Sequence, residues 1–100
     1  MEKEYTKKIF DEQINTRFSV TGSTAAVVEL ELIESIDKSS SGMRAFSLIF
    51  KGPREPVLDD NSYKMEQPQL GTLTLFISPY RQTKDATYYD AQFTKLLEED

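Results

Sequence analysis

The four glycines and four prolines of this chain all fall between short apolar segments rather than within them. The run FSLIFKGP over residues 46–53 is typical, because its alternation stops at Gly52-Pro53. Glycine supplies positive φ angles and proline cannot pair in the interior of a sheet, so these positions mark boundaries. Pro79 likewise predicts the end of the run over residues 72–78. Boundaries at such short intervals are typical of an all-β domain.

Between these boundaries, apolar residues recur at every second position. In the run over residues 43–51, Phe46, Leu48 and Phe50 share one face and Ser47 and Ile49 share the other. Such alternation indicates strands with one buried face and one wet face, as in antiparallel sheets. The predicted strands cover residues 17–20, 26–36, 43–51, 62–67, 72–78 and 87–94.

Residues 25–36 are also compatible with a helix. They are rich in helix-forming residues, and Leu30 and Ile33 fit a helical stripe. Glu29 and Glu31 flank Leu30 at a period of two, which favours a strand. The sequence therefore predicts a strand here and leaves the helix as the alternative.

The two ends of the chain carry weaker patterns. Residues 6–13 predict a short helix with Thr6 as its cap. Residues 90–97 could form a helix capped by Asp90. We expect instead a strand that frays into an acidic tail over residues 96–100.

Six short antiparallel strands must protect or close their edges. The sequence therefore predicts a mainly β fold, a small six-stranded barrel or sandwich of meander-like connectivity with a short N-terminal helix over one open end. Residues 1–100 form one domain in this interpretation, with a helical segment at 1–15, a β domain at 16–95 and the tail at 96–100.

The chain contains neither histidine nor cysteine. Disulfides are therefore impossible, and thiolate or imidazole metal sites are excluded. Ser-His and Cys-His nucleophile pairs are excluded for the same reason. We expect a protein that is not an enzyme, with no catalytic residues, no cofactor and no metal.

The formal net charge is −5, from 17 acidic and 12 basic residues. Repulsion from phosphate makes nucleic acid an unexpected partner for such a domain. No apolar run approaches the roughly 20 residues that span a bilayer, and residues 1–10 have no hydrophobic signal core. We therefore expect no membrane association, and a cytoplasmic location.

The order of the segments resembles a family of bacterial domains, domain of unknown function 6916. The likeness is carried by Phe18-Ser-Val20 after a short helix, FSLIFKGP at 46–53, YKMEQPQLGTLTLFISP at 63–79 and YYDAQFT at 88–94. The resemblance implies a small all-β fold and no established activity. Some relatives are found beside phage-tail-like or collar-type proteins, which implies an accessory role in a multi-protein assembly.

The chain departs from the family pattern at three places. Gln67 stands where relatives often have a histidine, so any catalytic role of that histidine is lost here. The segment Asp59-Asp-Asn-Ser62 replaces a Gln-Gly. Tyr80-Arg81 replaces a Val-Gly pair.

The acidic residues offer candidate sites that also have simpler interpretations. Asp59-Asp60-Asn61 could attract a hard cation, but it lacks the spaced ligands of a calcium loop, and such residues are common in turns. Glu29, Glu31 and Glu34 could supply an acid–base pair, but alternating carboxylates on a strand are usually solvated. Asp90 is the better acidic candidate because a residue on the wet face of a strand can line a groove.

Tyr80, Arg81 and Tyr88 form the cluster that most favours a binding function. Tyrosine and arginine dominate interface hot spots, and Pro79-Tyr-Arg81 is predicted to lie in a loop, where binding residues concentrate. Tyr89 is expected in the core. These three residues are the predicted interaction surface.

Three functions remain open at this point. The first is a non-enzymatic protein-interaction or structural module with a protein partner. The alternative is a carrier that holds a small apolar ligand inside a β-barrel, and the third is a carboxylate-dependent hydrolase. Large aromatic residues favour a filled interior, which argues against the carrier.

Overall fold

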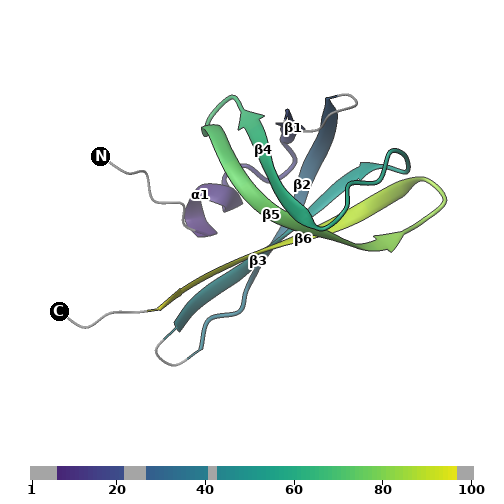
Figure 1. Ribbon diagram of the computed structural model, residues 1–100. Coiled ribbons are helices and arrows are strands. Elements are labelled where there is room, and N and C mark those ends of the chain that lie inside the picture. The colour runs from purple at the N-terminus through teal and green to yellow at the C-terminus, as the bar shows by residue number, and fades with distance from the viewer. Residues whose placement is uncertain (1–6, 22–26, 41–42, 97–100) are drawn as a thin grey trace.

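The computed structural model describes residues 7–21, 27–40 and 43–96, and its strands close into an antiparallel barrel (Figure 1). The elements in chain order are α1 (Lys7–Asp11), β1 (Arg17–Val20), β2 (Val28–Asp37), β3 (Met43–Pro53), β4 (Asn61–Gln67), β5 (Gly71–Gln82) and β6 (Ala86–Leu96). The predicted mainly β fold with a short N-terminal helix is confirmed, and the barrel replaces the sandwich alternative.

The strand order around the barrel is β1-β2-β3-β6-β5-β4. Strands β1 to β3 and β4 to β6 are two meanders, and the meanders join through β3 and β6, which pair from Met43↔Leu96 to Pro53↔Ala86. The segment over residues 54–60 therefore crosses between the halves, so the predicted meander-like connectivity holds within each half and was wrong only at this connection. The barrel closes where Ser19 of β1 pairs with Glu66 of β4.

Two strands continue past the ends that glycine and proline predicted for them. Strand β3 continues through Gly52 to Pro53, and β5 continues past Pro79 to Gln82. Pro53 lies at the last position of β3, where a missing N–H costs little. Pro79 lies next to a β-bulge, where the register shifts between the pairs Pro79↔Tyr89 and Arg81↔Tyr88. Proline is tolerated in a sheet at such bulges.

The ambiguous segments are strands. Residues 28–37 and 86–96 belong to β2 and β6, so neither alternative helix forms there. Strand β6 extends to Leu96, so the predicted tail starts too early; residues 97–100 lie outside the described residues. Helix α1 ends at Asp11, before the predicted end at residue 13, and the predicted cap Thr6 lies outside the described residues.

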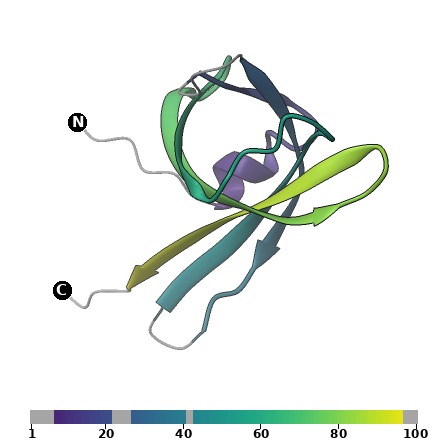
Figure 2. The ribbon, with the colours of Figure 1, turned by 45° about the vertical axis from the view of Figure 1, so that its right-hand side comes forward.

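Large side chains fill the barrel interior, and α1 lies across one end of it (Figure 2). Phe10 of α1 is fully buried and contacts Phe18, Phe46 and Phe93 with ring centroids 6.5, 5.9 and 5.2 Å away. The alternating apolar residues predicted to face inward are buried. They include Phe18, Val20, Leu30, Leu32, Leu48, Phe50, Met65, Leu73, Leu75, Ile77 and Tyr89.

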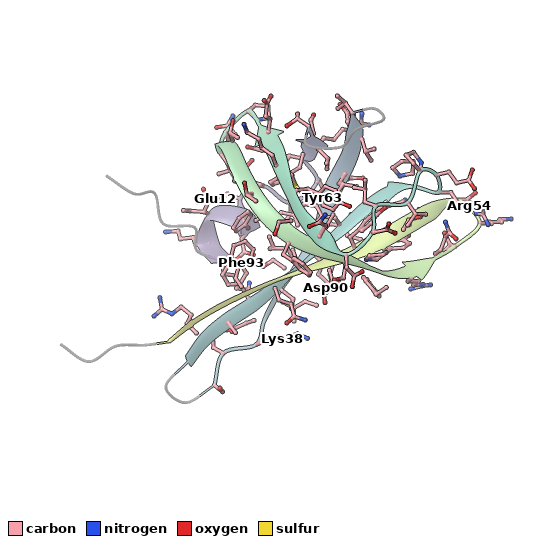
Figure 3. The ribbon with its side chains drawn as sticks, viewed as in Figure 1. Glu12, Lys38, Arg54, Tyr63, Asp90 and Phe93 are labelled. Carbon is pink, nitrogen blue, oxygen red and sulfur yellow. The ribbon has the colours of Figure 1, made fainter. Side chains whose placement is uncertain are left out.

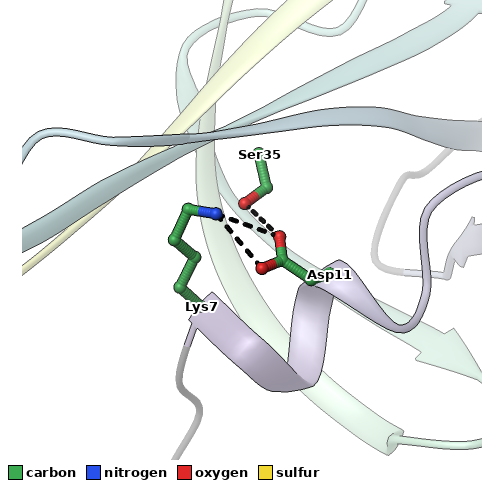
Figure 4. A network of polar contacts seen from close by, with 3 residues as sticks. All are labelled: Lys7, Asp11 and Ser35. Atoms are coloured by element: carbon green, nitrogen blue, oxygen red, sulfur yellow. Dashed lines mark hydrogen bonds and ion pairs between the residues drawn. The ribbon is translucent and has the colours of Figure 1, made fainter.

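Helix α1 is also fastened to strand β2 by a small polar network at the barrel opening (Figure 4). The Lys7 ammonium contacts both carboxylate oxygens of Asp11 at 3.2 and 3.1 Å, and the Ser35 hydroxyl on β2 donates to Asp11 Oδ1 at 2.6 Å. The Ser35 hydrogen bond is the main cause that lowers the pKa of Asp11. The network holds Phe10 over the barrel opening.

A second bulge changes which face of β2 looks outward. The register of β2 against β3 shifts between Leu32 and Glu34, so Leu32 pairs with Phe50 and Glu34 pairs with Ile49. Leu32 is buried inside the barrel, whereas Glu34 and Ile36 face outward beyond the bulge. The bulge therefore turns an acidic and an apolar side chain toward the same outer surface.

Candidate functional site

The predicted interaction residues lie on strands rather than in a loop. Tyr80 is the residue left unpaired by the bulge in β5, and its side chain is 53% exposed. Arg81 pairs in register with Tyr88 of β6, and its guanidinium carbon lies 5.6 Å from the centroid of the Tyr88 ring. The loop prediction was therefore wrong, but the structure does bring these three residues together.

Beside Tyr80, one row of outward-facing residues crosses four strands. Glu34 of β2 pairs with Ile49 of β3, Ile49 pairs with Asp90 of β6, and Asp90 pairs with Ser78 of β5. Paired residues in an antiparallel sheet point to the same face, so the four side chains form a continuous line. Asp90, which is far from Glu34 in sequence, is thereby brought close to it.

This row forms part of an open groove of about 300 Å³, hereafter the Asp90 groove. The groove is lined by Glu34, Ile36, Lys38, Ser47, Ile49, Tyr80 and Asp90. Glu34, Lys38 and Tyr80 are exposed, whereas Ser47 is only 2% exposed. Figure 3 shows Asp90 and Lys38 on the side of β3 and β6 that faces away from Phe93.

The two bulges explain why a groove exists on an otherwise convex barrel. The bulge in β2 precedes Glu34 and Ile36, and the bulge in β5 projects Tyr80. A bulge bends its strand and redirects a side chain, and bulges concentrate next to functional sites. The groove lies on the β3–β6 pair between the two bulged strands.

The floor of the Asp90 groove contains two buried polar atoms without partners. Gln92 donates to Asp90 Oδ2 at 3.1 Å, but neither Asp90 Oδ1 nor the Ser47 hydroxyl has a hydrogen-bond partner among the described residues. Most buried polar atoms in proteins are hydrogen-bonded, and each exception calls for an explanation. Two such atoms on one groove floor mark it as a candidate binding site.

The electrostatic surroundings of Tyr80 agree with its position at the rim of the Asp90 groove. Partial burial raises the pKa of Tyr80, the Arg81 charge opposes that shift, and the negative charges of Asp90 and Glu34 add to it. The tyrosine hydroxyl is therefore close enough to both carboxylates to sense their charge. The groove is an acidic surface with an aromatic side chain on its rim.

A larger groove, of about 650 Å³, lies elsewhere on the barrel and is a weaker candidate. Its lining includes Arg17, Glu29, Glu31 and Lys51, whose charges face one another across neighbouring strands. The Arg17 guanidinium contacts a Glu29 carboxylate oxygen at 3.2 Å. The charged groups of this larger groove are solvated or face a group of opposite charge. Among the described residues, no buried polar atom without a hydrogen-bond partner lies in this groove.

Gln67, at the position where relatives often have a histidine, is a buried structural residue. Its amide nitrogen donates to Gln13 Oε1 at 2.6 Å and to the Thr16 hydroxyl at 3.1 Å. Its amide oxygen accepts from the backbone N–H groups of Gln69 and Leu70, both at 2.7 Å. The side chain thus joins the β4–β5 turn to the segment after α1, and its hydrogen-bonding capacity is used fully.

The remaining acidic candidates do not converge. The bulge separates Glu34 from Glu29 and Glu31, which border the larger groove. At the turn before β4, the Asp59 backbone oxygen accepts from the Tyr63 hydroxyl at 2.9 Å, and Asn61 Oδ1 accepts from the Ser62 N–H at 2.8 Å. Within the described ranges, no three carboxylates come together in a metal-binding arrangement.

Sequence reasoning missed Phe76, Ser47 and Ile49 as surface residues of interest. Phe76 is on the outer face of β5 and is 56% exposed. It occupies the polar phase of the alternation between Thr74 and Ser78, so an aromatic residue in that phase was an available signal. Ser47 and Ile49 needed the strand register before they could be assigned to the groove.

No helix in the described part of the chain is long and apolar enough to cross a membrane. The family model described as "Domain of unknown function (DUF6916)" matches residues 5–93. No curated protein and no solved structure gives a significant match.

Proposed function

The chain belongs to the family of the domain of unknown function 6916, and we propose that it acts as a non-enzymatic interaction module that docks onto a larger protein or assembly. The docking surface is the β5–β6 face, which we define as Phe76, Tyr80, Arg81 and Tyr88 together with the adjoining Asp90 groove.

The observation that carries this proposal is the exposure of aromatic residues on one strand. Phe76 and Tyr80 on β5 are 56% and 53% exposed, and Arg81 lies over the ring of Tyr88 beside them. The few residues that carry most of the binding energy in protein interfaces are enriched in tryptophan, tyrosine and arginine. An exposed aromatic surface that borders a groove with unpaired buried atoms is consistent with an interface that a partner completes.

The filled interior supports this function over the carrier alternative. Twelve hydrophobic or aromatic side chains of the described residues, among them Tyr89, Phe10 and Phe18, are less than 2% exposed. A carrier needs an internal space of several hundred Å³, whereas both grooves described above open to the outer surface.

Affinity capture from the source cells tests the proposal. Wild-type protein should retain a discrete set of partners, and Tyr80→Ala and Arg81→Ala should each lose most of that set while keeping the wild-type melting temperature. Val57→Ala and Lys8→Ala are matched controls at exposed positions outside the β5–β6 hairpin. Equal recovery with all four variants would remove the β5–β6 face as the docking surface.

A further inference from the structure

The Asp90 groove has the features of a receptor for one particular side chain. Its floor combines a buried carboxylate oxygen, Asp90 Oδ1, with a buried hydroxyl, Ser47 Oγ, and neither has a partner among the described residues. A carboxylate accepts hydrogen bonds and cannot donate them, so the missing partner of Asp90 Oδ1 is a donor. The negative charge of the carboxylate favours a cationic donor, because charge-assisted hydrogen bonds are stronger than neutral ones.

The spacing of the two atoms favours a donor that presents several N–H groups. Ser47 pairs with Gln92, and Ile49 pairs with Asp90, so Ser47 and Asp90 are diagonal neighbours on adjacent strands. Diagonal neighbours on one face are about 7–8 Å apart at the backbone and closer at their side chains. A planar guanidinium can donate to both acceptors from different nitrogen atoms, whereas an ammonium is a compact point charge.

The walls of the groove match the rest of an arginine side chain. Ile36 and Ile49 provide apolar contacts for a methylene stem, and the exposed Tyr80 ring on the rim offers a face for cation–π stacking. Glu34 adds a second negative charge, while Lys38 supplies the single positive charge of the lining. The net charge of the groove is therefore −1.

We propose that the Asp90 groove receives an arginine side chain of the docking partner, with its guanidinium on Asp90 and Ser47 and its stem between Ile36 and Ile49. This inference rests on the proposed interaction function and specifies the chemistry of the partner. Lys38 and Tyr80 are long, exposed side chains on the rim, and they can adjust when the groove fills.

The test is a titration of isotope-labelled protein with N-acetyl-arginine-methylamide, followed by backbone amide chemical shifts. We expect saturable shifts centred on Ser47, Ile49 and Asp90, with about tenfold weaker binding in the isosteric Asp90→Asn variant. Asp85→Asn, which removes an exposed carboxylate from the turn between β5 and β6, should bind as the wild type does.

Three results would overturn the inference: no saturable shifts in the wild type, equal binding by Asp90→Asn, or equal binding of the matching lysine derivative. Ser47→Ala is the control for a folding artefact. It removes a buried hydroxyl that has no partner among the described residues, so the melting temperature should stay unchanged or rise. The same variant should bind the arginine probe more weakly than the wild type. If partner capture depends on Tyr80 but the arginine probe causes no saturable shifts in the Asp90 groove, only the arginine site is refuted. Probe binding without Tyr80-dependent capture would refute the proposed function instead.

Discussion

The side-chain amide of Gln67 on β4 donates a hydrogen bond to Gln13 Oε1 at 2.6 Å, which joins the strand barrel to the segment that follows α1. Both side chains are buried, at 3% and 8% exposure. A polar pair in such a setting stabilises the fold only while both partners are present, because a buried group left alone keeps its desolvation cost.

Gln67→Ala should therefore lower the free energy of unfolding by about 2–4 kcal/mol, since it removes several hydrogen bonds and leaves Gln13 Oε1 buried without that donor. Urea denaturation measures the change. Gln69→Ala is the matched control, because Gln69 is exposed and uses its backbone N–H in the turn. Similar losses for the two variants would contradict a special role for Gln67.

Gly52 should not tolerate a side chain. A Cβ at this position would lie 2.5 Å from Leu30 Cδ2 and 3.3 Å from Tyr89 Cε1, and both of those residues are fully buried. Gly52→Ala should cost about 1–3 kcal/mol through overpacking. Combining it with Leu30→Ala should cost less than the sum of the single changes, because the shortened side chain makes room. Additive costs in a denaturation cycle would show that the clash is absent.

Two phenylalanine truncations should separate core from surface. Phe10→Ala should destabilise the protein by about 3–5 kcal/mol, because Phe10 is fully buried and contacts three other phenylalanine rings. Phe76→Ala should change stability by less than about 0.5 kcal/mol, because Phe76 is 56% exposed. Thermal denaturation distinguishes these outcomes, and a large loss for Phe76→Ala would mean that Phe76 supports the fold and is not free for docking.

The stabilising contribution of the Asp11 carboxylate, which fastens α1 to β2, should be lost at acid pH. The pKa of Asp11 is lowered, chiefly by the Ser35 hydrogen bond, so folding favours the ionised carboxylate. Its contribution is present above the unfolded pKa of about 3.9 and is lost as pH falls through the lower folded value. Asp11→Asn should cost at most about 1 kcal/mol at neutral pH, because the group is largely solvated.

The difference between wild type and Asp11→Asn should shrink toward zero in denaturation curves recorded below about pH 4. Asp85→Asn, at an exposed turn, provides the comparison. A gap between wild type and Asp11→Asn that stays constant down to the lowest pH would rule out titration of Asp11 as its cause.

The strand positions and their buried faces could be predicted from the sequence because alternation is a local property. The phase of Phe46, Leu48 and Phe50 correctly predicted their place in the core. Barrel closure could not be predicted in the same way, because it depends on a short pairing between Ser19 and Glu66, far apart in the chain. The predicted strand ends were wrong where proline lies at a strand terminus or beside a bulge.

The candidate site was only partly predictable for the same reason. Tyr80, Arg81 and Tyr88 carried a signal in their residue types. The Asp90 groove depends instead on register, since the line from Glu34 through Ile49 to Asp90 exists only after three strands pair. The bulge that turns Glu34 outward coincides with the adjacent apolar residues Leu32 and Ile33, which break the alternation but do not by themselves give the new register.

Site-specific photocrosslinking in the source cells tests the central claim most directly, that the β5–β6 face docks onto a protein partner. A benzophenone amino acid would replace Tyr80 in one variant and Val57 in another, since both positions are exposed and neither is in the core. The account predicts a discrete crosslinked product of higher mass from position 80 and none from position 57. Identical products from both positions, or no product from position 80, would contradict it.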